Sequence, residues 1–458
     1  MESAKFHRSS PGAPSQGVAE TGSRLSTLAW PGAAYLGAGA VAVATGALAA
    51  KEPLAGVALV AAVGAGAVAV RLTRLGTVEL LLAALPWLIV FDGLTPSLLR
   101  TFVVTAAALA MLTLAMPLRY RDAVGPIAAC VFAAVVLGNA IFATDPDQLI
   151  QASKYLIFPA VALAVLSERG QEQLPNARNV VLASCALAMV VHLGIVAAGL
   201  GQTGTKYDIG EQLGFGRGIV HEMALTFVVV AAAGLVSSDR LLYQVSFFAL
   251  GAVPALLTGV RSALLSLIVV VVMFVIRSRL SRRSLAVVAL ILAVAFASGG
   301  AKIVQERFAE QAQREQTLSE VGSNRGAIWT VAVTPWWNGG PPEWLFGMGL
   351  GSIEDLELRE LGEPYVGHSD LIQIGVTLGV VGLAVWALLW LVLLRSRLES
   401  IILVPLIVFA LVNGSMIYVT PLTLGLAFAA ACRPPPSTPD EESLSKAFVN
   451  ERPSEGER

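Results

Sequence analysis

The sequence predicts an all-α polytopic integral membrane protein with about 12–14 transmembrane helices and one large extracytoplasmic loop that contains short helices. Of its 458 residues, 55% are hydrophobic and only 14% are charged, and the mean hydropathy is +0.72. A soluble domain does not sustain these values, because its surface needs more polar side chains. The apolar runs extend over about 16 to 20 residues and are apolar all round, which excludes the alternating strands of a membrane β-barrel.

Fourteen apolar runs are long enough to be considered as membrane spans. They are 29–50, 53–70, 77–92, 101–117, 125–143, 149–167, 178–200, 219–237, 241–258, 262–276, 284–300, 369–394, 400–415 and 417–432. Lys51-Glu52 and Gly414-Ser415 interrupt short pairs that can form hairpins of imperfect spans. The membrane domain is therefore expected over 28–432, between disordered cytoplasmic tails at 1–27 and 433–458.

Basic residues in alternate connectors predict the orientation of the chain. These connectors carry Arg71, Arg74, Arg119, Arg121, Arg169, Arg178, Arg240, Arg277, Arg279, Arg282, Arg283, Arg395 and Arg397. Both termini are then cytoplasmic. The connector 201–218, the turn 257–261 and the large loop 301–367 fall together on the opposite, extracytoplasmic side.

The large loop is expected to contain two short helices. Residues 302–320 mix apolar and charged side chains, as in a helix lying on a membrane surface. A second helix is predicted from Arg325 to Val333, after the capping pair Ser323-Asn324. The segment 334–342, which contains three prolines and two glycines, is predicted to be irregular, and the glycines of 347–351 predict a turn with close backbone approach.

Two arginines on the extracytoplasmic side are candidates for binding phosphate. Arg217 is flanked by glycines, and Arg261 follows Thr258-Gly259 at the mouth of a span. A guanidinium group binds phosphate oxygens in bidentate geometry, so two such residues at one rim would suit a diphosphate. The alternative is that they reach lipid headgroups or pair with Glu222.

His368 is the candidate general base, because it is the histidine of the large loop and an imidazole accepts a proton near neutral pH. Asp370 follows two residues later and can orient the imidazole if a helix begins at Ser369. The alternative for His368 is a capping or interface role.

The same loop holds four tryptophans, among which Trp336 and Trp337 are candidates for stacking on sugar rings. A position in the aromatic belt of the membrane interface is the alternative. The loops contain no metal-ligand cluster and no phosphate-binding Gly-Lys-Ser/Thr motif, so neither a metal, another cofactor, a nucleotide nor a nucleic acid is expected as a ligand.

Four ordered motifs resemble those of the O-antigen ligase and polymerase superfamily, over roughly 214–430. They are Leu257-Thr258-Gly259-Val260-Arg261, Asn324-Arg325-Gly326-Ala327-Ile328-Trp329, Leu345-Phe346-Gly347-Met348-Gly349-Leu350-Gly351 and His368-Ser369-Asp370-Leu371-Ile372-Gln373. Members often have asparagine at the position of Ser369 and near that of His221, so this chain departs from the pattern there.

The resemblance implies a multi-pass glycosyltransferase of the bacterial cytoplasmic (inner) membrane. It would transfer glycan from an undecaprenyl-diphosphate carrier to a glycan, lipid or protein acceptor, without a metal. Arg261 and Arg217 would bind the diphosphate, Arg325 matches a further arginine of the family, and His368 would be the base. We expect attack of the acceptor hydroxyl with inversion at the anomeric carbon.

Two alternatives to a ligase remain at this stage. A polymerase of lipid-linked repeats would use the same chemistry with another acceptor. A transporter or flippase of lipid-linked sugars would instead show repeated halves and charges near the middle of the membrane, where Lys154 is the main candidate.

Overall fold

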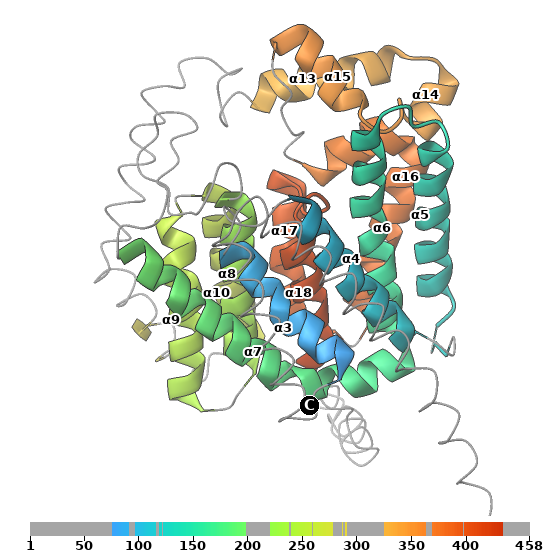
Figure 1. The fold of residues 1–458 in the computed structure, drawn as a ribbon. Coiled ribbons are helices and arrows are strands. Elements are labelled where there is room, and N and C mark those ends of the chain that lie inside the picture. The colour runs from blue at the N-terminus through green and yellow to red at the C-terminus, as the bar shows by residue number, and fades with distance from the viewer. Residues whose placement is uncertain are drawn as a thin grey trace, which may run out of the picture. The chain divides into compact units, whose positions relative to one another are not determined.

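The computed structural model describes residues 76–90, 97–115, 119–120, 122–197, 220–237, 240–258, 260–277, 286, 289–290, 325–362, 369–396 and 398–433. Within these ranges the chain forms fourteen α-helices (Figure 1). They are α3 (Thr77–Val90), α4 (Ser97–Leu114), α5 (Val124–Ala140), α6 (Pro146–Leu166), α7 (Glu168–Ala197), α8 (Val220–Val236), α9 (Leu241–Leu257), α10 (Arg261–Arg277), α13 (Arg325–Asn338), α14 (Pro341–Phe346), α15 (Ser352–Leu361), α16 (Asp370–Arg395), α17 (Ser400–Asn413) and α18 (Val419–Ala431).

The structure confirms an all-helical polytopic membrane protein. Eleven of the predicted spans coincide with helices, and α6, α7 and α16 are each long and apolar enough to cross a bilayer. The predicted spans 29–50 and 53–70, the tail 1–27, the predicted C-terminal tail after Arg433 and the predicted helix 302–320 lie outside the described residues, as does almost all of 284–300. The helix α7 begins at Glu168, ten residues before the predicted span, because the polar segment that precedes the apolar run is also helical.

The interior of the bundle is formed by α8 and α18. Every residue of α18 is buried, and α8 is buried from Glu222 to Leu235. The helix α18 contacts α6, α7, α8 and α17, which surround it. After His221 and Glu222 in the first turn of α8, both helices carry only apolar residues and threonines, which is the pattern of a helix enclosed by others.

Alternate connectors meet at one end of the bundle, as the sequence predicted. The backbone N–H of Glu168, before α7, donates to the carbonyl of Arg119, before α5, at 3.1 Å. Arg433, after α18, donates to the Gln171 side chain in α7 at 2.7 Å. We call this the basic end. The opposite end carries α13, α14 and α15, and we call it the loop end (Figure 1).

The loop-end helices are joined to α16 at a break within that helix. Gly379 has φ 70° and ψ −173°, so the regular helical hydrogen bonds stop there. The freed carbonyls of Val376 and Thr377 accept hydrogen bonds from the N–H groups of Met348 and Gly349, at 2.8 and 3.2 Å. The turn at 347–351 was predicted to allow close backbone approach, and the structure shows this approach directed at α16.

One prediction for the large loop is wrong. The segment 334–342 is mostly helical: α13 continues to Asn338, with Pro335 inside it, and α14 begins at Pro341. Proline is well tolerated in the first turn of a helix, where its missing N–H has no helical partner, so Pro341 and Pro342 favour the start of α14.

Candidate functional site

The start of α16 is fixed by one buried carboxylate. Asp370, the first residue of the helix, accepts hydrogen bonds from the N–H and hydroxyl of Ser415, at 2.8 and 2.7 Å, and from the N–H of Met416 at 3.1 Å. Its side chain is 1% exposed. The predicted contact between Asp370 and His368 stays a prediction, since His368 lies outside the described residues. The position that follows it, Ser369, is the N-cap of α16, and its backbone nitrogen lies beside Gly414 in the turn between α17 and α18.

The turn that Asp370 binds lies inside the protein. The helices α17 and α18 have 14 and 13 residues, so each is about 20 Å long, which is short of the roughly 30 Å of a bilayer core. Asn413 and Ser415, at the turn, are both 0% exposed. Gly414 takes a positive φ of 79°, which glycine adopts without strain. The start of α16 is therefore recessed within the bundle.

Arg261 lies at the same end of the bundle as this turn. The helix α10 runs antiparallel to α17, because Arg277 at its end forms an ion pair with Glu399 before α17, and Ser266 donates to the carbonyl of Pro405 at 3.3 Å. Arg261, the first residue of α10, thus falls at the end where α17 finishes. The structure brings Arg261 and the start of α16 to one end of the bundle, although 108 positions separate Arg261 from Ser369 in the sequence.

Local structure around Arg261 favours an anion. Thr258 ends α9; its hydroxyl donates to the carbonyl of Ala255 at 2.6 Å and accepts from the N–H of Val260 at 3.3 Å. This tight connection starts α10 at Arg261, whose side chain is exposed. The first N–H groups of a helix and its positive dipole end attract anions, and a guanidinium group at this position adds a full charge.

Residues at the start of α8 meet the same turn. The rings of His221 and Tyr418 lie 6.3 Å apart between centroids, and Tyr418 is the N-cap of α18. Glu222, next to His221, is 3% exposed. His221, Tyr418 and Glu222 therefore lie at the same end of the bundle as Arg261 and Asp370.

The two candidate tryptophans have different environments. Trp336 packs partly buried against α16, where Ile372 and Val376 contact the same cluster, and its indole N–H donates to the carbonyl of Glu343 at 3.0 Å. Trp337 is 65% exposed. Trp336 therefore joins α13 and α14 to α16, while Trp337 contacts the ring of Trp336 in a T-shaped arrangement and is otherwise largely exposed.

The other sequence candidates are placed only in part. Arg325 begins α13, and the structure describes its backbone. Arg217 and His368 lie outside the described residues. Their assignments as diphosphate ligand and general base stay predictions.

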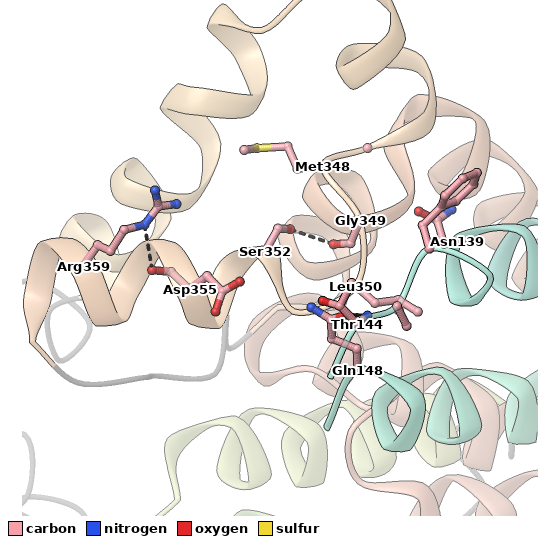
Figure 2. A pocket seen from close by; sticks show the side chains of 12 residues that line it. Asn139, Thr144, Gln148, Met348, Gly349, Leu350, Ser352, Asp355 and Arg359 are labelled. Carbon is pink, nitrogen blue, oxygen red and sulfur yellow. Dashed lines mark hydrogen bonds between the residues drawn. The ribbon is translucent and has the colours of Figure 1, made fainter. Parts of the chain in front are cut away.

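A polar cleft of about 450 Å³ opens at the loop end, and none of the described sequence candidates lines it. It lies between the α5–α6 connector, the turn at 347–351 and α15. Figure 2 shows Ser352, Asp355 and Arg359 of α15 on one side and Asn139, Thr144 and Gln148 on the other. This cleft could not be predicted from the sequence, because its polar residues come from segments about 200 positions apart.

A polar contact beside the cleft joins α15 to α6. The Gln151 side chain donates to Glu354 Oε1 at 3.0 Å and accepts from the N–H of Gly351 at 2.8 Å. Burial raises the pKa of Glu354 above its ordinary range, and nearby Gln373 and Lys154 oppose this only in part. Lys154, predicted as a charge within a span, thus lies close to a loop-end carboxylate.

The turn between α17 and α18 was also missed as part of a site. Its signal was present, because Asn413 and Ser415 are polar residues between two apolar runs, and polar side chains within membrane segments are costly unless they are paired. The sequence does not show that their partner is Asp370, which comes from another helix.

Comparison with known proteins agrees with this arrangement. Residues 246–387 match the family model described as O-antigen ligase. The matched segment runs from α9 through most of α16, so it contains Arg261, the loop-end helices, the start of α16 and its break at Gly379. A search of curated proteins finds no match. The family match confirms the resemblance and supports transfer of a lipid-linked glycan, of ligase or polymerase type, as the class of activity.

Proposed function

We propose that this protein transfers glycan from undecaprenyl diphosphate to an acceptor hydroxyl at its loop end, which faces the extracytoplasmic side of the bacterial inner membrane. The observation that carries the proposal is the meeting of two family motifs at one end of the bundle. Arg261 is the first residue of α10. The motif that begins at His368 contains Asp370, which binds Ser415 in the turn between α17 and α18, at the same end of the bundle. Both termini are then cytoplasmic, with the basic end.

The proposed reaction needs a positive charge that stabilises the leaving diphosphate and a general base that accepts a proton. Arg261, together with Arg217, neutralises the diphosphate as it leaves the anomeric carbon. His368 takes the proton of the acceptor hydroxyl as its oxygen forms the new glycosidic bond on the opposite face of the sugar. The configuration is inverted, the lipid diphosphate departs with the bonding electrons, and the proton stays on His368.

The recessed turn supports this mechanism physically. A buried carboxylate with three hydrogen bonds holds the start of α16 in one place, directly after the position of the proposed base. Catalysis by positioning is sensitive to displacements of about 1 Å. Arg261 begins α10 and Ser369, which follows the proposed base, caps α16; α17 packs against both of these helices.

A transfer assay with purified protein in detergent tests this function. The donor is undecaprenyl-diphosphate glycan, EDTA is present, and the acceptors are lipid A core, a second lipid-linked repeat and a serine-containing peptide. Transfer to lipid A core identifies a ligase, and extension of the lipid-linked repeat identifies a polymerase. Absence of transfer to every acceptor, with properly folded protein, would contradict the proposal and leave transport of the lipid-linked sugar as the function to test.

A further inference from the structure

We propose that the cleft between the α5–α6 connector and α15 is a saccharide-binding site that holds part of a substrate glycan away from the reacting bond. The cleft has a volume of about 450 Å³, which accommodates a small oligosaccharide segment. The cleft and the proposed reaction centre are formed by different residues, because neither Arg261 nor Asp370 lines the cleft. The inference rests on the proposed function for the identity of the glycan.

Hydrogen bonds within the protein hold both walls of the cleft in place. Gln148 accepts from the N–H of Thr144 at 2.9 Å, and Asp145 accepts from the N–H of Asp147 at 2.8 Å, which fixes the connector before α6. On the other side, the Ser352 hydroxyl donates to the carbonyl of Gly349 at 2.8 Å, and Gly349 is itself bonded to α16. A preformed site avoids the entropic cost of ordering its walls on binding.

The side chains of α15 present open hydrogen-bonding groups to the cleft (Figure 2). Arg359 uses its Nε to donate to the carbonyl of Asp355 at 3.2 Å, which leaves its two terminal nitrogens available. Among the described residues, the Asp355 carboxylate has no hydrogen-bond donor. One group that accepts and one that donates, four residues apart on a helix, match the mixed donors and acceptors of neighbouring sugar hydroxyls.

An aromatic ring completes the set. Phe142 lines the cleft and is 83% exposed, which is unusual for a phenylalanine unless it faces lipid or a ligand. The apolar face of a pyranose packs on such a ring while its hydroxyls bind polar groups at the edge. Ile141, beside Phe142, is 79% exposed as well, so the cleft lies next to an apolar surface.

The charge of the cleft selects against other ligands. Asp355 and Arg359 are its charged residues among those described, and their charges cancel. A phosphate would be repelled by the carboxylate, and a metal ion by the guanidinium group. A neutral, hydroxyl-rich ligand has no such cost, and it can come from the lipid-linked donor or from the acceptor.

Direct binding to the full-length protein in detergent tests the inference. The soluble probes are the oligosaccharide released by mild acid from the lipid-linked donor and the oligosaccharide of the acceptor, and free undecaprenyl diphosphate is the third probe. The variants are Phe142→Ala and the double variant Asp355→Ala/Arg359→Ala. The control is Glu360→Ala, an exposed carboxylate on the same helix that does not line the cleft.

We expect one of the two oligosaccharides to bind, and this probe identifies the source of the sugar. Its affinity should fall about tenfold or more in the double variant and in Phe142→Ala, because hydrogen bonds to charged groups and ring contacts are lost. Glu360→Ala should bind it as the wild type does. Equal affinity of the cleft variants and the wild type, or no binding of either oligosaccharide, would overturn the saccharide site. Failure of undecaprenyl diphosphate to bind the wild type would instead contradict the proposed function. The binding of the oligosaccharides would still test whether the cleft is a saccharide site.

Discussion

The Asp370 carboxylate accepts a 2.7 Å hydrogen bond from the Ser415 hydroxyl inside the bundle, although the two residues are 45 positions apart. This contact joins the start of α16 to the buried turn between α17 and α18. It fixes the start of α16, directly after the proposed base. The helices α17 and α18, which supply this contact, lie outside the segment 246–387 that matches the family model.

Removal of the Asp370 carboxylate should cost both stability and activity. In Asp370→Ala, the buried N–H groups of Ser415 and Met416 lose their acceptor, at a cost of about 1–3 kcal/mol each. Ser415→Ala should cost less, because it removes one donor and leaves the carboxylate bound to two N–H groups. Thermal unfolding in detergent measures the order. Equal stability of Asp370→Ala and the wild type would show that the contact does not hold α16.

The break in α16 should depend on Gly379. A Cβ at this position would lie 2.2 Å from the carbonyl oxygen of Leu345, and φ is positive, so Gly379→Ala should separate the loop-end helices from α16. Limited proteolysis should then cut the loop-end helices faster than in the wild type.

Gly138→Ala is the matched control for Gly379→Ala. A Cβ at Gly138, in α5, meets no atom within 4 Å, so alanine should be neutral or stabilise by up to about 1 kcal/mol. If Gly379→Ala is as resistant to protease as Gly138→Ala, the break does not control docking of the loop.

Docking of α15 should weaken as the pH rises. Burial raises the pKa of Glu354, so the folded protein favours the protonated carboxyl. The resulting stability is fully present below the ordinary pKa of a glutamate and is lost as the pH rises through the raised pKa of the folded state. Glu354→Gln keeps an acceptor for Gln151 and removes the charge. Its protease resistance should be less dependent on pH than that of the wild type; an unchanged pH profile would contradict this assignment.

The ion pair between Arg277 and Glu399 should set the alignment of α10 and α17. Glu399 is 1% exposed and also caps α17 by accepting from the N–H of Ile401 at 3.2 Å. Arg277→Met leaves this carboxylate without its cation and should destabilise the protein and reduce transfer. The double variant Arg277→Met/Glu399→Met removes both charges and should recover part of the loss. If the double variant is less stable than Arg277→Met, the loss of stability in Arg277→Met is not caused by leaving the buried Glu399 carboxylate without a cation.

Much of the fold was predictable from the sequence, because a membrane helix needs about 20 apolar residues and such runs are visible directly. The end of the bundle at which Arg261 lies was also predictable, from the arginines of alternate connectors. The helix through Pro335 was not predictable: Trp336 packs on α16 and binds the carbonyl of Glu343, and these tertiary contacts outweigh the local preference of the segment.

The site was less predictable than the fold. Short motifs indicated Arg261 and the start of α16, since these residues follow one another in a recognisable order. The partner of Asp370 and the cleft beside α15 depend on side chains from distant helices, such as Ser415 and Gln148. No periodicity or spacing in one segment contains that information.

Transfer by Arg261→Ala tests the central claim most directly. The variant is compared with Arg395→Ala, which removes an exposed arginine at the end of α16, in the assay with undecaprenyl-diphosphate glycan. Loss of a guanidinium group that stabilises the leaving diphosphate should lower kcat/KM by at least about a hundredfold, with unfolding temperatures equal to that of Arg395→Ala. Arg261→Lys should restore only part of the rate, because an ammonium group lacks the planar fork. Transfer by Arg261→Ala at the rate of Arg395→Ala would contradict the account.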